Sequence, residues 1–245
     1  MNSFLKDLEK TGPFLVASLD GDDLPFLLEE ARTARADMAE IRMDLWSNFF
    51  REDWAVKMAR FKEKIRLPLL VSFRGGKPFP PWWLPVHWKA LSAASLIDVE
   101  WNAAYPWREI TKQARDHKVA LMISHHDYQK TPSLRELTKI VKKAYGKKAD
   151  IVKIATRVQN ESDVRTLFEL NNLFGKRLIT VMGMGPLGAL SRFVAPLFNS
   201  CLVYGYIGTP TASGQLPFRD LQERMRAFYP RYDSLFQERS SRLVL

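Results

Sequence analysis

The segment VALMISHHDYQKTPSLRELTKIVKKAYGKKADIVKIA, residues 119–155, decides the fold because it contains a complete strand–helix–strand unit. Its ends, Val119 to Ser124 and Ile151 to Ala155, are short apolar runs with the length and β-branched content of buried strands. Between them, Ser133 to Tyr145 has helical periodicity, and Glu136 follows the serine by three residues, as in a capping box. Two strands joined by a helix are typical of a parallel sheet.

The same alternation extends along the whole chain. Eight apolar runs have strand character: Phe14 to Leu19, Met38 to Leu45, Pro68 to Phe73, Leu96 to Trp101, Val119 to Ser124, Ile151 to Ala155, Leu178 to Met182 and Cys201 to Tyr206. Helical periodicity marks eight others: Leu24 to Thr33, Asp53 to Lys64, Pro85 to Ala94, Trp107 to Asp116, Ser133 to Tyr145, Ser162 to Phe174, Leu187 to Phe198 and Phe218 to Tyr229. Eight pairs in 245 residues match a TIM barrel, whereas a doubly wound sheet more often has five or six strands. The sequence therefore predicts an α/β fold in which residues 1–245 form a single-domain (β/α)8 barrel.

Composition narrows the class of protein. A hydrophobic content of 46% is enough to form a sizeable core, which excludes a disordered or fibrous chain. The single cysteine, Cys201, can form no intramolecular disulfide, and no apolar run reaches the roughly 18 residues of a membrane span. We therefore expect a cytoplasmic protein with no membrane partner.

The chain is basic, with 37 Lys and Arg against 27 Asp and Glu, a net charge of +10. Such a surplus suits an anionic partner. We expect no nucleic acid, because no recognition motif accompanies the charge. Pairs such as Lys142 with Lys143 and Lys147 with Lys148 lie on a predicted helix or its end, and we interpret them as a solvated exterior.

Polar side chains interrupt strands that should be apolar. Glu40, Arg42 and Asp44 alternate with apolar residues, so all three face one side of their strand. One such strand could be an edge with its charges in water. Four more strands carry polar groups near one end: Ser72 and Arg74; Asp98 and Glu100; Ser124, His125, His126 and Asp127; and Lys153. Convergence on one pocket at the carboxyl ends of barrel strands explains all five together.

Lys153 and His126 are the candidate catalytic residues. Apolar neighbours and nearby arginines would lower the pKa of the Lys153 amine, which favours a nucleophile that forms a Schiff base. The alternative is a strand lysine whose amine reaches the surface. His126 is suited to carry a proton, and His125 competes with it, although adjacent strand residues face opposite ways. The spacing of the two histidines is poor for joint ligation, so we expect neither a metal nor another cofactor.

The loop GMGPLG, residues 183–188, formally satisfies the GxGxxG fingerprint of dinucleotide sites. No Asp or Glu follows it until Asp220, so the acid that would hold a ribose is missing. We interpret the glycines as letting the loop approach a substrate, with Arg192 binding a carboxylate or phosphate.

Seven segments carry a resemblance to a known family: EIRMD at 40–44, SFR at 72–74, IDVE at 97–100, SHHDYQKTP at 124–132, DIVKIA at 150–155, MGMGPLGALSR at 182–192 and TASGQ at 211–215. By these motifs, in this order, the chain resembles the type I 3-dehydroquinate dehydratases, which are Schiff-base-forming barrel enzymes of the shikimate pathway. The resemblance covers nearly the whole chain.

The resemblance implies a hydro-lyase that converts 3-dehydroquinate to 3-dehydroshikimate in aromatic amino acid biosynthesis. Lys153 would form the imine with the substrate ketone, and His126 would remove the neighbouring proton and help to expel the hydroxyl as water. The residues that would hold the substrate or line its pocket are Ser18, Glu40, Arg42, Arg74, Met184, Arg192, Tyr204, Thr211 and Gln215. The expected partner is therefore a small-molecule carboxylate. Because members of the family are often homodimers, the resemblance also leaves a homodimer open for this chain.

One departure concerns the catalytic histidine. The family usually carries a glutamate in an EGG run shortly after the strand-three arginine, and this glutamate orients the histidine. Here GGKPFPP follows Arg74, and the next acid is Asp98. Three alternatives remain: reduced activity, replacement by another acid such as Glu100, or a non-catalytic relative that keeps the pocket. A Schiff-base aldolase on the same barrel is a fourth.

The altered segment, KPFPPWWLPVHW at residues 77–88, is rich in proline and tryptophan. Packing within a rebuilt loop is one interpretation. A patch that binds a partner is the other, because exposed Trp and Pro clusters often mark interfaces.

Overall fold

The computed structural model describes residues 2–20, 23–45, 54–73, 93–102 and 106–242. Within these residues, a parallel strand forms at each of the eight apolar runs: β1 (Phe14–Asp20), β2 (Met38–Arg42), β3 (Leu69–Phe73), β4 (Leu96–Glu100), β5 (Ala120–Asp127), β6 (Ile151–Arg157), β7 (Ile179–Met184) and β8 (Leu202–Gly208). A two-residue strand, β9 (Leu216–Pro217), pairs with β8 and is too short to show a sequence period.

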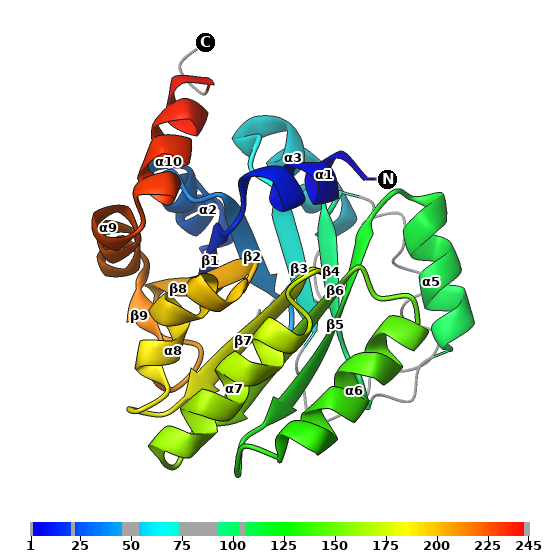
Figure 1. The fold of residues 1–245 in the computed structure, drawn as a ribbon. Helices are drawn as coiled ribbons and strands as arrows, with labels where there is room; N and C mark the ends of the chain where they lie inside the picture. Colours follow the sequence, from blue (N-terminus) through cyan, green and yellow to red (C-terminus); the bar gives the residue numbers. More distant parts are fainter. Residues whose placement is uncertain (1, 21–22, 46–53, 74–92, 103–105, 243–245) are drawn as a thin grey trace.

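The strands form one curled sheet in the order β7-β6-β5-β4-β3-β2-β1-β8-β9 (Figure 1). Its two sides meet where Ile179 of β7 bridges Ser200, just before β8. There the Cys201 amide donates to the Ile179 carbonyl oxygen at 2.9 Å. The sheet therefore closes on itself, and the predicted TIM barrel is confirmed.

Helices connect the strands and cover the outside of the barrel (Figure 1). They are α1 (Ser3–Thr11), α2 (Leu24–Thr33), α3 (Trp54–Ile65), α5 (Trp107–Asp116), α6 (Leu134–Gly146), α7 (Glu161–Leu173), α8 (Ala189–Val194), the 3-10 helix η1 (Ala195–Phe198), α9 (Phe218–Phe228) and α10 (Pro230–Arg242). The predicted ranges agree closely for α2, α3, α5, α6, α7 and α9. The helix expected over residues 85–94 lies almost wholly outside the described residues.

Some boundaries differ from the prediction for physical reasons. The single helix expected over residues 187–198 is split into α8 and η1, because Pro196 has no N–H to continue an α-helical ladder. The second strand ends at Arg42 rather than Leu45, where a Leu45 amide to Arg42 carbonyl hydrogen bond turns the chain. Helices α1 and α10 are additional to the eight predicted.

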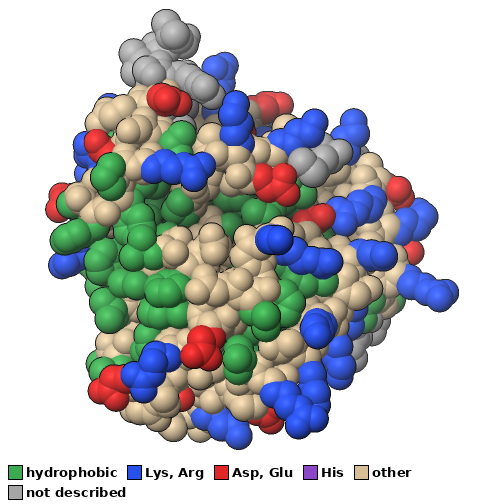
Figure 2. Space-filling model, viewed as in Figure 1, with side chains coloured by type: hydrophobic (Ala, Val, Ile, Leu, Met, Phe, Trp, Pro, Cys, Tyr) green, Lys and Arg blue, Asp and Glu red, His purple; other side chains and the backbone are tan. Residues whose placement is uncertain are grey.

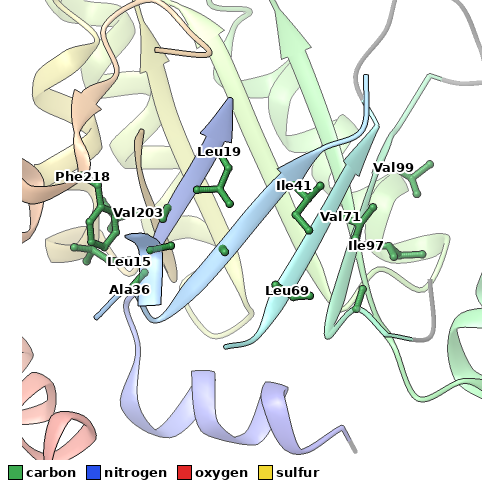
Figure 3. Packing of buried hydrophobic residues seen from close by; sticks show 14 of the residues in the cluster. Leu15, Leu19, Ala36, Ile41, Leu69, Val71, Ile97, Val99, Val203 and Phe218 are labelled. Carbon is green, nitrogen blue, oxygen red and sulfur yellow. The ribbon is translucent and has the colours of Figure 1, made fainter. Parts of the chain in front are cut away.

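The two faces of each strand contribute to two different cores. Outward residues such as Leu15, Ile41 and Val71 pack against the helices (Figure 3). Inward residues fill the barrel and include Val16, Met38, Leu70, Leu96 and Met122. Helix α1 lies across the amino-terminal ends of the strands, and its side chains Phe4, Leu5 and Leu8 belong to the inner core (Figure 1). Because α1 closes that end, a pocket is left to the carboxyl end.

Charged side chains are unevenly distributed over the surface. On the face shown in Figure 2, Lys and Arg side chains gather over the α5 and α6 side, whereas apolar side chains gather toward α8 and α9. Lys142, Lys143 and Lys148 are exposed, but Lys147 is half-buried, with Nζ 3.8 Å from the centroid of the Trp107 ring. Burial and Lys143 lower the pKa of Lys147. In the described part of the chain, every helix is too short or too polar to cross a bilayer.

Candidate active site

Six buried polar residues form a layer inside the barrel, toward the carboxyl ends of β1 to β6. They are Ser18, Glu40, Ser72, Asp98, Ser124 and Lys153, each at most 1% exposed. The parallel register places Ser18 opposite Glu40, Ser72 opposite Asp98, and Ser124 opposite Lys153. Sequence reasoning singled out five of these positions because each breaks an apolar strand, and Ser18 followed from the family resemblance; the structure brings all six together.

Lys153 lies at the centre of this layer and is fully buried. Its Nζ is 3.4 Å from Asp98 Oδ2, 3.8 Å from Glu40 Oε1, and 4.2 Å from the centroid of the Tyr204 ring. The ion pairs that the described residues form with Lys153 are therefore with carboxylates, whereas we expected arginines beside it. The two carboxylates and the aromatic face stabilise a buried ammonium. The carboxylates can also accept its proton.

Glu40 connects the lysine to the rest of the pocket. Its Oε2 accepts a hydrogen bond from Ser18 Oγ at 2.6 Å, and its Oε1 accepts one from Ser72 Oγ. Ser18 Oγ also lies 3.2 Å from Thr211 Oγ1, in the loop that follows β8. The carboxylate is thus held on both oxygens, which fixes its position beside the Lys153 amine.

His126 is placed by Glu100, the acid that the sequence analysis offered as a replacement for the missing glutamate but did not include among the residues that hold the substrate. Its Nδ1 is 2.5 Å from Glu100 Oε2, and its backbone N–H donates to Glu100 Oε1 at 3.1 Å. The Tyr128 ring stacks on the imidazole, with centroids 6.1 Å apart. The two-residue spacing of Asp98 and Glu100, which places both on the inner face of β4, was the signal for this contact.

His125 faces the other way, as strand alternation requires. Its ring meets that of Trp101 edge-on, with centroids 6.3 Å apart, and its burial lowers its pKa despite Asp127. His126 is consequently the histidine that lines the pocket. Among the described residues, no group of three or more His, Cys, Asp or Glu is arranged to hold a metal ion.

The pocket opens at the carboxyl end of the barrel and has a volume of about 120 Å³. Nine predicted residues line it: Glu40, Arg42, His126, Lys153, Met184, Arg192, Tyr204, Thr211 and Gln215. Ser18 contacts two of these lining residues, Glu40 and Thr211. Arg74 lies outside the described residues. Lining residues that the sequence reasoning did not single out for the site are Tyr128, Ala155, Arg157, Met182, Ala212 and Ser213.

Three arginines lie in this lining, Arg42, Arg157 and Arg192, and the surroundings of Arg42 and Arg192 differ. Arg42 forms a two-pronged ion pair with Asp44, at 2.9 Å to Oδ1 and 2.6 Å to Oδ2. Arg192 is 4% exposed, and its contacts include Met182 Sδ at 3.8 Å and the Ser213 carbonyl oxygen at 3.4 Å, both uncharged. A guanidinium in the lining of a pocket is suited to bind an anion.

The loop over the pocket is held in place by side chains of the site. Gln215 Oε1 accepts hydrogen bonds from the Thr211 amide at 2.9 Å and from Thr211 Oγ1 at 3.0 Å. The Ser213 carbonyl accepts from the Gly185 amide at 3.3 Å. The Thr211–Gln215 loop therefore joins β1 to the end of β7 across the mouth of the pocket.

The glycines of residues 183–188 have a packing role that our interpretation of the loop did not include. A Cβ on Gly188 would lie 2.4 Å from the Gly183 carbonyl carbon, and one on Gly183 would lie 2.7 Å from Gly188 Cα. The Gly183 amide also donates to Ser191 Oγ at 2.6 Å. The motif lets the start of α8 approach the end of β7, which places Arg192 at the pocket wall.

A closed parallel barrel with an ionic pocket at the carboxyl ends of its strands defines a (β/α)8-barrel enzyme. Comparison with known families is more specific, because the type I 3-dehydroquinase family matches residues 16–230. The chain belongs to the type I 3-dehydroquinase family.

Individual relatives agree. A 3-dehydroquinate dehydratase of Methanosarcina acetivorans is 32% identical over 237 residues, which cover 89% of this chain and 96% of the relative. One from Escherichia coli is 29% identical over 228 residues, covering 86% and 90%. The crystal structure of the type I enzyme from Clostridium difficile, obtained with covalently modified comenic acid, superposes with a TM-score of 0.77 at 28% identity, covering 89% of this chain and 93% of that one.

Proposed function

We propose that this protein dehydrates 3-dehydroquinate to 3-dehydroshikimate, a step of aromatic amino acid biosynthesis, through an imine on Lys153. One observation carries the proposal: a fully buried lysine lies between Asp98 and Glu40 in a pocket that also contains His126 and Arg192. Relatives named for this activity and the covalent ligand of the Clostridium difficile enzyme support it.

The first stage is the formation of the imine. A carboxylate accepts the ammonium proton, so that the neutral amine adds to the ketone carbon of the substrate. Loss of water from the resulting carbinolamine gives a protonated imine, which attracts electrons from the adjacent carbon. The carboxylates that hold the ammonium before the reaction then offset the charge of the iminium, because it forms on the same nitrogen.

His126 then acts twice. It removes the proton from the carbon next to the iminium, which gives an enamine, and the imidazolium returns this proton to the departing hydroxyl. Water leaves, the iminium is restored, and its hydrolysis releases the product and the amine. Atoms balance with one water lost overall and no external oxidant.

Arg192 orients the substrate by binding its carboxylate. Its guanidinium lines the pocket, and a guanidinium forms strong paired hydrogen bonds with a carboxylate, so it is positioned to bind the carboxylate of the substrate. The loop that contains Thr211 and Gln215 covers the bound molecule, which keeps bulk water from the iminium.

Reductive trapping tests the proposal. Borohydride added with 3-dehydroquinate should leave a covalent adduct on Lys153, detected by peptide mass spectrometry, because it reduces the imine. Lys153→Ala should give no adduct and no turnover, whereas Lys142→Ala, at an exposed position of α6, should behave as wild type. His126→Ala should lower kcat about 10²- to 10⁴-fold. Normal substrate binding by calorimetry without an adduct would contradict the imine. Aldol cleavage without dehydration would instead favour an aldolase.

A further inference from the structure

Glu100 makes a two-point contact with a single residue. One carboxylate oxygen accepts from the His126 backbone N–H at 3.1 Å, and the other is 2.5 Å from Nδ1 of the same residue. The two residues face each other across neighbouring strands, because β4 and β5 pair with Glu100 opposite Ser124. One carboxylate thus fixes both the backbone and the ring of His126.

The sequence leaves few other acids for this role. No Asp or Glu occurs between Arg74 and Asp98, so the segment that follows β3 can contribute none. Asp98 and Glu40 lie beside the Lys153 amine, and Asp127 accepts from the Gln129 and Lys130 amides. Glu100 is the acid that reaches His126 among these.

We propose that Glu100 is the positioning residue of His126: it holds the Nδ1–H tautomer and directs Nε2 toward the substrate. This inference deepens the proposed function and rests on it for its kinetic consequences. A hydrogen bond from Nδ1–H to a carboxylate fixes the tautomer and the ring angle, and it stabilises the imidazolium that forms after proton removal.

The charge of Glu100 also affects how strongly His126 binds a proton. The other ionisable groups of the same pocket are Glu40, Arg42, Tyr128, Lys153, Arg157 and Arg192. The carboxylate of Glu100, in direct contact with the ring, favours the protonated imidazole, whereas the cationic Arg42, Lys153, Arg157 and Arg192 disfavour it. Removing that charge should lower the pH at which His126 loses its proton, and with it the strength of the base.

The test compares Glu100→Gln, which keeps the shape but removes the charge, with Glu100→Asp, which keeps the charge. Glu223→Gln, on the exposed side of α9, is the matched control. Nitrogen-15 NMR of the four histidines, assigned with His125→Asn and His126→Asn, follows the titration of His126 without substrate. In Glu100→Gln we expect a lower titration midpoint, with kcat about 10²-fold lower and KM within about threefold of wild type. Glu100→Asp should keep the wild-type midpoint and recover part of kcat.

The arms of the experiment separate the possible failures. An unchanged His126 midpoint in Glu100→Gln would overturn the proposal, even if the variant were less stable. If that variant does not fold, wild type still decides: at high pH the Nδ1–H tautomer of His126 supports the proposal, and the Nε2–H tautomer contradicts it. A wild type with no turnover but with the expected tautomer and midpoint shift would overturn the proposed function while leaving the contact with Glu100 intact.

Discussion

Lys153 shows, at the scale of one residue, how a barrel core accommodates a charge. An ammonium with no exposed surface costs several kcal/mol in desolvation unless charges of opposite sign and good geometry compensate it. Here Asp98 and Glu40 lie within 4 Å of Nζ, and the Tyr204 ring covers another side. The same carboxylates that stabilise the resting ammonium are positioned to take its proton, so burial and reactivity depend on the same contacts.

Arg192 provides the prediction at this scale. Arg192→Ala should raise KM for 3-dehydroquinate about 10- to 100-fold with a smaller effect on kcat, because a charge-assisted hydrogen bond to a carboxylate contributes about 1.5–3 kcal/mol. Steady-state kinetics would measure this. Arg219→Ala, at an exposed position of α9, is the control and should leave KM unchanged. An unchanged KM in Arg192→Ala would remove the guanidinium from substrate binding.

At the scale of single elements, β5 and α6 show how local sequence places functional groups. β5 continues through Asp127, so strand alternation sends His126 into the pocket and His125 toward Trp101. Helix α6 begins at the predicted capping box. Ser133 Oγ accepts from the Glu136 amide, and the Ser133 amide donates to Glu136 Oε2 at 3.0 Å. Hydrogen bonds from Ser133 lower the pKa of Glu136.

The cap of α6 is testable by denaturation. Ser133→Ala should lower the free energy of unfolding by about 1 kcal/mol, since the first turn loses its side-chain acceptor. For a chain of this size the corresponding fall in Tm is about 2–4 °C. Thr138→Ala, in the middle of the same helix, should be neutral or slightly stabilising, because alanine has the higher helix propensity. Equal losses in both variants would contradict a specific role for the cap.

At the scale of the whole molecule, the junction between β7 and β8 closes the barrel with few backbone hydrogen bonds. The isolated bridge at Ile179 and Ser200 is supported by side chains. Thr180 Oγ1 donates to the Leu202 carbonyl at 2.7 Å and lies 2.8 Å from Ser200 Oγ, which accepts from the Val181 amide at 3.2 Å. Hydroxyl groups therefore replace part of the ladder that joins the other strands.

Cys201 can report on this closure, because it is the only cysteine and its amide belongs to the junction. Burial raises the pKa of its thiol, so iodoacetamide should label the native protein at least about 100-fold more slowly than the denatured protein. Thr180→Val should accelerate native labelling about 5- to 30-fold, which corresponds to about 1–2 kcal/mol for the lost hydrogen bonds. Thr166→Val, on the surface of α7, should leave the rate unchanged. Identical rates for wild type and Thr180→Val would show that the junction does not limit access.

Much of the fold and of the site is legible in the sequence, because both depend on local periods. The two-residue alternation of β1 to β6 separates Leu15, Ile41 and Val71, which face the helices, from Ser18, Glu40 and Lys153, which face the interior. The repeated strand and helix lengths indicate the barrel, and the spacing of Ser133 and Glu136 indicates where α6 begins. Each of these signals lies within a few residues along the chain.

Contacts between distant segments were decided only by the tertiary structure. Glu100 and His126 are 26 residues apart, and their contact follows from the register of β4 and β5. The closure of the amino-terminal end of the barrel likewise depends on how α1 packs onto the inner core. The sequence by itself determined which side chains face the interior, since alternation is a property of a single strand. The charges that meet around Lys153 and His126 were decided by strand register and ring closure, because these depend on the packing of the whole barrel.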